Sequence, residues 1–403
     1  MRLQLTSTSL ALRPHRIPVF ALIAVGALLG SARADDGVVV RGNYWRDRNT
    51  RVLAPEIAFS KELPSGTIIG GGYLLDAITS ASAAAGVLSD QPFTELRNQI
   101  GANIAQRLGP ATLGVNYRYS TEGDYWAHTA GAIASLDLFQ RNTTLAASYD
   151  FGYAEAAKRI SPTGYVPIGH LRSHFLILSV AQVLSRWAVG DLSLELSRLG
   201  DHNDPQSFQS NPYRQVKVSG TPTVEVEPLE RNRLAANGGL RMAVPVNAGI
   251  VRAITFYVKF RYYTDDWGIQ AVSPELRSYL QLGPVELRVT GRYYYQTAAD
   301  FYPRDKSGNP LIEAEYATTG VKAKWCANLC YTGDAKLSQF TSVFIEGRIQ
   351  FPLRFLSFKS MPLGLWLGEG LMAISYGHYI NDRFAHFQYG DADVAGLELS
   401  FPL

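Results

Sequence analysis

The sequence predicts a single antiparallel, up-and-down transmembrane β-barrel of about 16 strands, with short turns at one end and long loops at the other. Three observations support this fold class. Apolar and polar residues alternate along many short segments, the connections alternate between short and long, and the N-terminus resembles a secretory signal. Aromatic residues make up 11% of the chain and charged residues only 18%. The mean hydropathy is −0.05, too low for a bundle of membrane helices.

Residues 1–34 are expected to be a cleaved signal peptide. Their start is basic without an acidic residue, and the apolar run at 19–29 is too short to span a bilayer as a helix. Ala32 and Ala34 complete an A-x-A cleavage pattern, so residues 35–403 would form the mature barrel. The signal contains four of the 38 basic residues, and its removal leaves 34 against 35 acidic ones. This balance argues against a nucleic-acid partner.

The alternation has a period of two, as in a strand with one apolar and one polar face. In residues 285–296, every second residue is apolar, glycine or tyrosine, and most of the residues between them are polar or charged. The same pattern recurs at 113–120, 187–197, 254–262 and 343–351. Because every backbone polar group must be paired in a bilayer, a strand protein can span it only as a closed barrel. The sequence therefore predicts an outer-membrane location.

The chain can be divided into strands by this pattern and by turn residues. The predicted strands are 38–46, 52–62, 67–77, 94–107, 111–120, 126–138, 143–153, 173–184, 187–199, 233–244, 250–263, 268–282, 285–298, 337–351, 365–378 and 393–402. Residues 311–324 also alternate, and we assign them to an outer loop because bacterial barrels of one chain have an even strand number. Short turns are expected on the periplasmic side and long loops outside.

The polar faces place ten charged residues on the expected lumen wall. They are Arg118, Asp191, Glu195, Lys259, Arg261, Glu286, Arg288, Arg292, Glu346 and Arg348. A barrel of about 16 strands is wide enough for an aqueous channel unless it is plugged. We therefore expect a porin-like passive channel for small solutes. The alternative is a non-conducting barrel that scaffolds an envelope or electron-transfer complex.

Several phrases of the sequence are typical of one family. They are LDAITSAS at 75–82, YSTEGDY at 119–125, NTTL at 142–145, YYYQTAADFY at 293–302 and YTGDAKL at 331–337. Together they make the chain resemble the domain-of-unknown-function 3570 family of predicted outer-membrane proteins, over nearly all of the mature chain. The resemblance implies a barrel and a surface location, and it implies no activity.

No motif of a hydrolase, a metalloprotease or a phosphate-binding loop is present in the sequence. A second alternative, a barrel lipid hydrolase, would need a serine and a histidine in contact at the rim, for which Ser173, His174 and His378 are candidates. Histidines in loops and at interfaces are the simpler interpretation. We therefore expect no enzyme activity.

Acidic residues of the family-like phrases map to the outer ends of strands. Oxygen ligands from several loops could hold Ca²⁺ or Mg²⁺, although aspartate also favours turns for its own hydrogen bonds. The candidate ligands are Asp76, Glu122, Asp124, Asp300 and Asp334. No other cofactor is expected. Cys326 and Cys330 are candidates for a small-loop disulfide. The expected partners are outer-membrane lipid, the barrel assembly machinery and further copies of the chain.

Overall fold

The computed structural model describes residues 36–47, 50–80, 93–159, 164–208, 215–218, 221–304, 307–309, 320–326, 328–330, 332–356, 369–381 and 391–403. The predicted signal peptide lies outside these ranges. Within them, no helix is long and apolar enough to cross a membrane.

Strands account for most of the described chain. The barrel strands are β1 (Gly37–Arg46), β2 (Thr50–Glu62), β3 (Thr67–Ser80), β4 (Phe93–Leu108), β5 (Ala111–Thr121), β6 (Tyr125–Leu138), β7 (Thr143–Arg159), β8 (Tyr165–Ser185), β9 (Ala188–Gly200), β12 (Glu230–Ala248), β13 (Val251–Asp265), β14 (Gln270–Leu282), β15 (Val285–Gln296), β16 (Phe340–Pro352), β17 (Leu371–Asn381) and β18 (Ala392–Pro402). The remaining elements are the hairpin strands β10 (Gln215–Val218) and β11 (Thr221–Val224) and the 3-10 turns η3 (Ala335–Leu337) and η4 (Leu353–Leu356).

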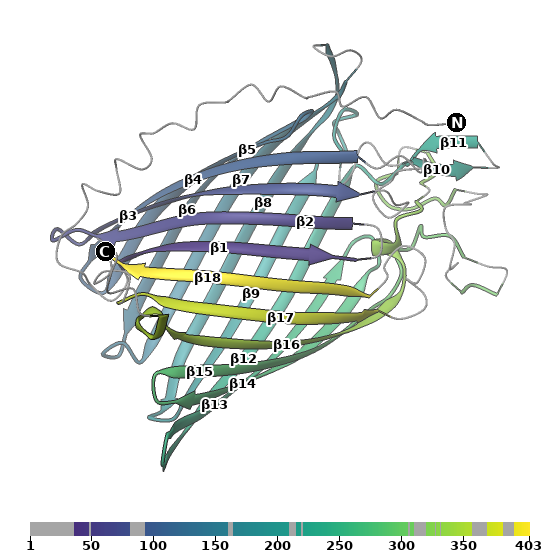
Figure 1. The fold of residues 1–403 in the computed structure, drawn as a ribbon. Coiled ribbons are helices and arrows are strands. Elements are labelled where there is room, and N and C mark those ends of the chain that lie inside the picture. Colours follow the sequence, from purple (N-terminus) through teal and green to yellow (C-terminus); the bar gives the residue numbers. More distant parts are fainter. Residues whose placement is uncertain are drawn as a thin grey trace, which may run out of the picture.

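Sixteen strands close into one antiparallel barrel, which confirms the predicted fold class. Successive strands pair with each other, except that β9 pairs with β12 because β10 and β11 form a separate hairpin between them. The first and last strands complete the ring, in a register that runs from Gly37 opposite Pro402 to Arg46 opposite Asp393. Figure 1 shows β1 beside β18 at this seam. Closure removes the unpaired edges that an open sheet would expose.

The two ends of the barrel differ in their connections. At the short-turn end, most hairpins turn within a few residues. Gly109 and Gly283 adopt left-handed φ angles of 65° and 56° in two of these turns, and each is followed by proline. The loop end carries the β10–β11 hairpin and the long connection from β15 to β16. The C-terminus lies at the opposite end from this hairpin (Figure 1).

The outward face of the wall is apolar. On β5, Leu113, Val115 and Tyr117 alternate with inward residues and are 51%, 55% and 48% exposed. An extended apolar band of this kind is unfavourable in water and favourable in hydrocarbon. The alternation read from the sequence is therefore explained by a wall with lipid on one side and the lumen on the other.

Some predicted strand ends are wrong. β7 continues to residue 159 and β8 begins at residue 165, so most of the predicted loop at 154–172 is strand. Ala154 and Ala156 are buried there, and His170 pairs with Ser207 of the connection that follows β9. The connection after β9 lies against this end of β7 and β8, so these residues need not alternate between apolar and polar as residues facing lipid do. This contact cannot be seen in a local pattern.

Two further assignments concern the last third of the chain. The predicted strand at 365–378 is observed as β17 and begins at residue 371, after residues 357–368, which lie outside the described ranges. Of the predicted outer loop at 311–324, residues 320–324 are described and belong to no barrel strand. The even strand number agrees with placing this segment in a loop.

Candidate functional site

Charged side chains of opposite sign line the inner face of the barrel from β9 round to β2. Directly opposite residues of an antiparallel pair share one face, so the strand registers define which side chains face the lumen. Arg288 Nη2 lies 2.8 Å from Glu346 Oε2, between β15 and β16. Glu398 on β18 joins Arg348 of β16 at 3.0 Å and Arg41 of β1 at 2.9 Å. The last contact crosses the seam that closes the barrel.

A second group of contacts links β9, β12 and β13. Arg261 Nη1 donates to Glu195 Oε1 at 2.7 Å and to Asn237 Oδ1 at 2.9 Å, and the Tyr257 hydroxyl donates to Asp191 at 3.0 Å. These residues line an inner cavity of about 330 Å³. The Arg261 and Glu195 side chains remain 40% and 35% exposed, so the ion pair lies in a hydrated space.

The other predicted lumen residues have few partners. Lys259 and Arg292 line the same cavity, and Arg292 donates to the Tyr379 hydroxyl at 3.0 Å. Arg118 and Glu286 also face inward, and neither makes an ion pair within the described part of the chain. The structure thus places all ten predicted lumen residues on the inner face and brings seven of them into the hydrogen bonds and ion pairs above.

The opposite wall, from β3 to β8, carries small residues. Gly101, Gly114 and Gly131 face inward there, opposite Arg118, Ile133 and Asn116 in the strand registers. Ile133 is 46% exposed although it points to the interior. The glycines leave room in the lumen along this wall, which also carries inward charges at Arg118 and Asp150.

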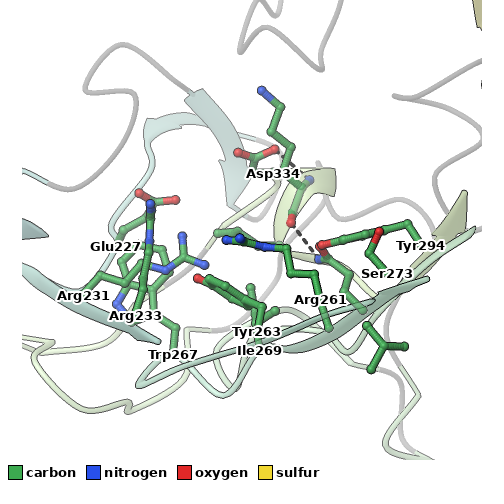
Figure 2. Close-up of a pocket in the computed structure, with 15 residues that line it drawn as sticks. Glu227, Arg231, Arg233, Arg261, Tyr263, Trp267, Ile269, Ser273, Tyr294 and Asp334 are labelled. Carbon is green, nitrogen blue, oxygen red and sulfur yellow. Dashed lines mark hydrogen bonds between the residues drawn. The ribbon is translucent and has the colours of Figure 1, made fainter. Parts of the chain in front are cut away.

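A cavity of about 510 Å³ lies at the loop end, against β12 to β15. Figure 2 shows Arg231, Arg233 and Arg261 extending into it from neighbouring strands, with Tyr263 between them. Its apolar side is part of a buried cluster formed by the loops. This cluster consists of Trp267, Ile269, Ala298, Ala299, Phe301, Tyr302, Cys330 and Leu337. The inward-facing Gln296 donates to the carbonyls of Lys336 and Ser338, so the long connection after β15 packs over the lumen mouth.

Asp265 organises the base of this cavity. Its buried carboxylate accepts two hydrogen bonds from Arg231, at 2.9 and 2.5 Å, and one from the Tyr263 hydroxyl at 2.7 Å. It also accepts the backbone amides of Trp267 and Ile269, which fixes the turn between β13 and β14. The charge of Arg231 is thereby neutralised. Arg231 also lies 4.2 Å above the Trp267 ring, a cation–π contact.

Arg233 is in a different position. It follows Arg231 by two residues on the same face of β12, and it makes no hydrogen bond or ion pair within the described residues. Its Nε is shielded from solvent and has no acceptor. The cavity therefore contains one arginine whose donors are not used by the protein.

Comparison with known proteins agrees with this architecture. The family described as "Protein of unknown function (DUF3570)" matches residues 76–342, well over half of the chain. The chain belongs to this family. A search of curated proteins finds no relative by sequence.

Solved structures share the fold of this DUF3570 chain at low sequence identity. CdiB from Acinetobacter baumannii is 8% identical with a TM-score of 0.51, and the match covers 92% of this chain and 61% of CdiB. A bacterial polysaccharide outer membrane secretin is 6% identical with a TM-score of 0.48, covering 92% and 100%. OccK1 (OpdK) from Pseudomonas aeruginosa is 12% identical with a TM-score of 0.41, covering 91% and 97%. The similarity to CdiB is one of barrel fold alone.

The predicted metal ligands lie in two separate places. Asp76 pairs with Arg97 between β3 and β4. Glu122 and Asp124 follow in the connection after β5, where burial and the neighbouring Glu95 carboxyl raise the pKa of Glu122 to about 7. Desolvation is the larger of these two causes.

Asp300 and Asp334 belong to the loops after β15 and are separated from β3 by β16, β17, β18, β1 and β2. The Asp300 amide donates to the Trp267 carbonyl at 2.8 Å, and Asp334 accepts the Lys336 amide at 3.0 Å. The structure therefore does not bring the five candidates into one cluster.

Among the described residues, a cluster with metal-site spacing is formed by Asp201, His202 and Glu230. None of these is among the predicted ligands. Glu230 accepts His202 Nδ1 at 2.6 Å and Arg198 Nη2 at 2.9 Å, and the His202 ring stacks on Trp325 with centroids 4.0 Å apart. Arg198 thus already supplies a positive charge to this carboxylate.

The candidate rim serine and histidine do not meet. Ser173 and His174 are neighbours on β8, so their side chains point to opposite faces: Ser173 toward Gly152 on the inner face, and His174 toward Tyr149 on the outer face. His378 Nδ1 donates a hydrogen bond to the Asp393 carboxylate at 2.9 Å. No serine contacts it within the described part of the chain.

The cysteines and one basic residue complete the comparison with the sequence. Cys326 and Cys330 are joined in a disulfide with a Cα–Cα distance of 5.9 Å, and Cys330 is fully buried in the loop cluster. Arg233, the first residue of the predicted strand at 233–244, is not among the predicted lumen residues. Arg231, two residues earlier on the same face, is the signal that could have extended the strand and indicated a basic site.

Proposed function

We propose that this barrel is an outer-membrane channel through which small polar solutes diffuse passively. Its short turns would face the periplasm and its loops the outside, as in other bacterial barrels. The observation that carries the proposal is the open, hydrated inner wall. The inward-facing Arg261 and Glu195 side chains, although paired, remain 40% and 35% exposed, and Ile133 is 46% exposed on the inside. A closed interior would bury these groups as a packed core does.

The charge distribution supports a selective path. Mixed charges lie on the wall from β9 to β2, whereas β3 to β8 combine small residues with charged ones such as Arg118 and Asp150. A solute in the lumen would therefore experience a field across the pore. Charged walls of this kind concentrate and orient ions through electrostatic attraction.

Liposome swelling tests the proposal. Vesicles containing the folded barrel are placed in isosmotic solutions of uncharged sugars of increasing size, and entry of the sugar causes swelling. We expect swelling with the small sugars and a size limit for the larger ones. A folded barrel that causes no swelling contradicts the channel and favours the scaffold.

A matched pair of cysteine variants locates the path. Ile133→Cys on β6 places a thiol in the lumen, and Val115→Cys on β5 places one on the outer face, where Val115 is 55% exposed. The two native cysteines are already paired. A bulky methanethiosulfonate reagent should slow swelling in the first variant and leave the second unchanged. Equal effects would contradict passage through the lumen.

A further inference from the structure

The 510 Å³ cavity at the loop end contains a basic group that an open channel does not require. Arg233 projects into it from β12 without an ion pair or hydrogen bond within the described residues, and its Nε is sealed from solvent. An arginine that loses hydration without gaining a partner is unfavourable, and proteins usually pair such a group. An external anion would supply the missing partner.

None of the neighbouring acidic side chains makes a hydrogen bond or ion pair with Arg233 in the described part of the chain. Asp265 lies near it but is occupied by Arg231, the Tyr263 hydroxyl and two loop amides. Glu227 and Asp334 line the cavity, where Asp334 accepts the Lys336 amide at 3.0 Å and Glu227 attracts Arg233 through its charge without a hydrogen bond between them in the described chain. Arg261 is held by Glu195 and Asn237. The presence of these acids favours an incoming group of one negative charge over one of two, because each added charge is repelled.

The geometry of the guanidinium group indicates which kind of anion would bind. Its planar array of donors matches the two oxygens of a carboxylate in a bidentate pair. Ser273 on β14 also lines the cavity and has no hydrogen-bond partner within the described residues. Its hydroxyl offers a further donor within the cavity.

The other side of the cavity is apolar and aromatic. Trp267, Ile269 and Leu337 belong to the buried loop cluster, and Tyr263 and Tyr294 border it. A cavity of several hundred Å³ with a few polar groups set in an apolar lining is the usual form of a small-molecule site.

We infer that this cavity is a binding site for a small organic monocarboxylate with a planar apolar body, anchored by Arg233. The inference deepens the proposed channel by naming a class of solute that it would take up. It rests on that function only for the route by which the solute reaches the cavity. Binding itself can be measured on the purified barrel without any passage of solute.

Titration calorimetry of the purified barrel in detergent tests the site, with benzoate as the probe. Benzamide, of the same shape without charge, should bind at least about tenfold more weakly, the effect of losing one charge-assisted hydrogen bond. Inorganic phosphate should also bind more weakly than benzoate. Benzamide or phosphate binding as tightly as benzoate overturns the inference, and this comparison needs no variant.

Arg233→Gln should weaken benzoate binding by at least about tenfold. Because Arg233 makes no ion pair in the described part of the chain, its replacement should leave the folded barrel intact. The control is Arg354→Gln, which removes the same charge from an exposed position in η4, outside the cavity. Equal benzoate affinity in the Arg233 variant and the wild type refutes the anchor. A barrel that swells liposomes but does not bind benzoate refutes the site alone, and one that binds benzoate without swelling refutes the channel alone.

Discussion

The seam between the first and last strands provides a quantitative test of how the ring is held. Glu398 on β18 lies 2.9 Å from Arg41 of β1 and 3.0 Å from Arg348 of β16. The three side chains are 29%, 42% and 20% exposed, so solvent screens their attraction in part. Exposed ion pairs contribute about 0.2–1 kcal/mol each. Glu398→Gln weakens two pairs and should lower the free energy of unfolding by about 0.4–2 kcal/mol.

A double-mutant cycle isolates the contact across the seam. Urea unfolding of the barrel in lipid vesicles, followed by tryptophan fluorescence, should give a coupling of about 0.5–1 kcal/mol between Glu398→Gln and Arg41→Gln. The control cycle combines Glu398→Gln with Arg118→Gln instead of Arg41→Gln. Arg118 is an inward arginine of β5 without an ion pair in the described chain, so the two stability losses should be additive. Equal coupling in the two cycles would refute a specific stabilising contact at the seam.

Three other predictions follow from local geometry. Gly114→Ala should destabilise the barrel by about 1–3 kcal/mol in urea unfolding, because its Cβ would lie 2.7 Å from that of Ala105. Gly101→Ala, whose nearest contact would be 3.7 Å, should have little effect, and equal losses would contradict this packing. Because the pKa of Glu122 is raised from 4.5 to about 7 in the fold, the wild type loses stability as the pH rises from about 4.5 to about 7. Glu122→Gln should therefore unfold at higher urea than wild type at pH 8 and lose this advantage near pH 4, and an advantage confined to pH 4 would contradict the raised pKa. Reduction of the loop disulfide, which closes only a short loop, should leave the heat-modifiable mobility of the barrel on gels unchanged. Loss of the folded band would show that the barrel depends on it.

The alternation in the sequence was sufficient to predict the barrel and the inward charges. A wall between lipid and water requires apolar and polar side chains on alternate residues. The sequence of a segment such as 285–296 therefore shows which residues face lipid and which face the lumen. The pattern was misleading where a strand extends beyond this wall. In β7 and β8, Ala154 and Ala156 are buried by a distant segment, and small residues there resembled a loop.

The cavity at the loop end was outside the reach of the same pattern. Alternation shows that Arg261 faces inward but not that Glu195, on a strand far away in the sequence, neutralises it. Likewise, nothing local distinguishes Arg231, which pairs with Asp265, from Arg233, which does not. The free arginine emerges only when three strands and two loops are brought together.

The central claim is that the barrel encloses an open aqueous path, and single-channel conductance in a planar bilayer tests it most directly. The purified mature protein should give stepwise, reproducible currents, and Glu398→Gln should shift the selectivity toward anions because it removes a negative charge from the inner wall. A folded, heat-modifiable barrel that inserts into the bilayer and passes no current would contradict the account.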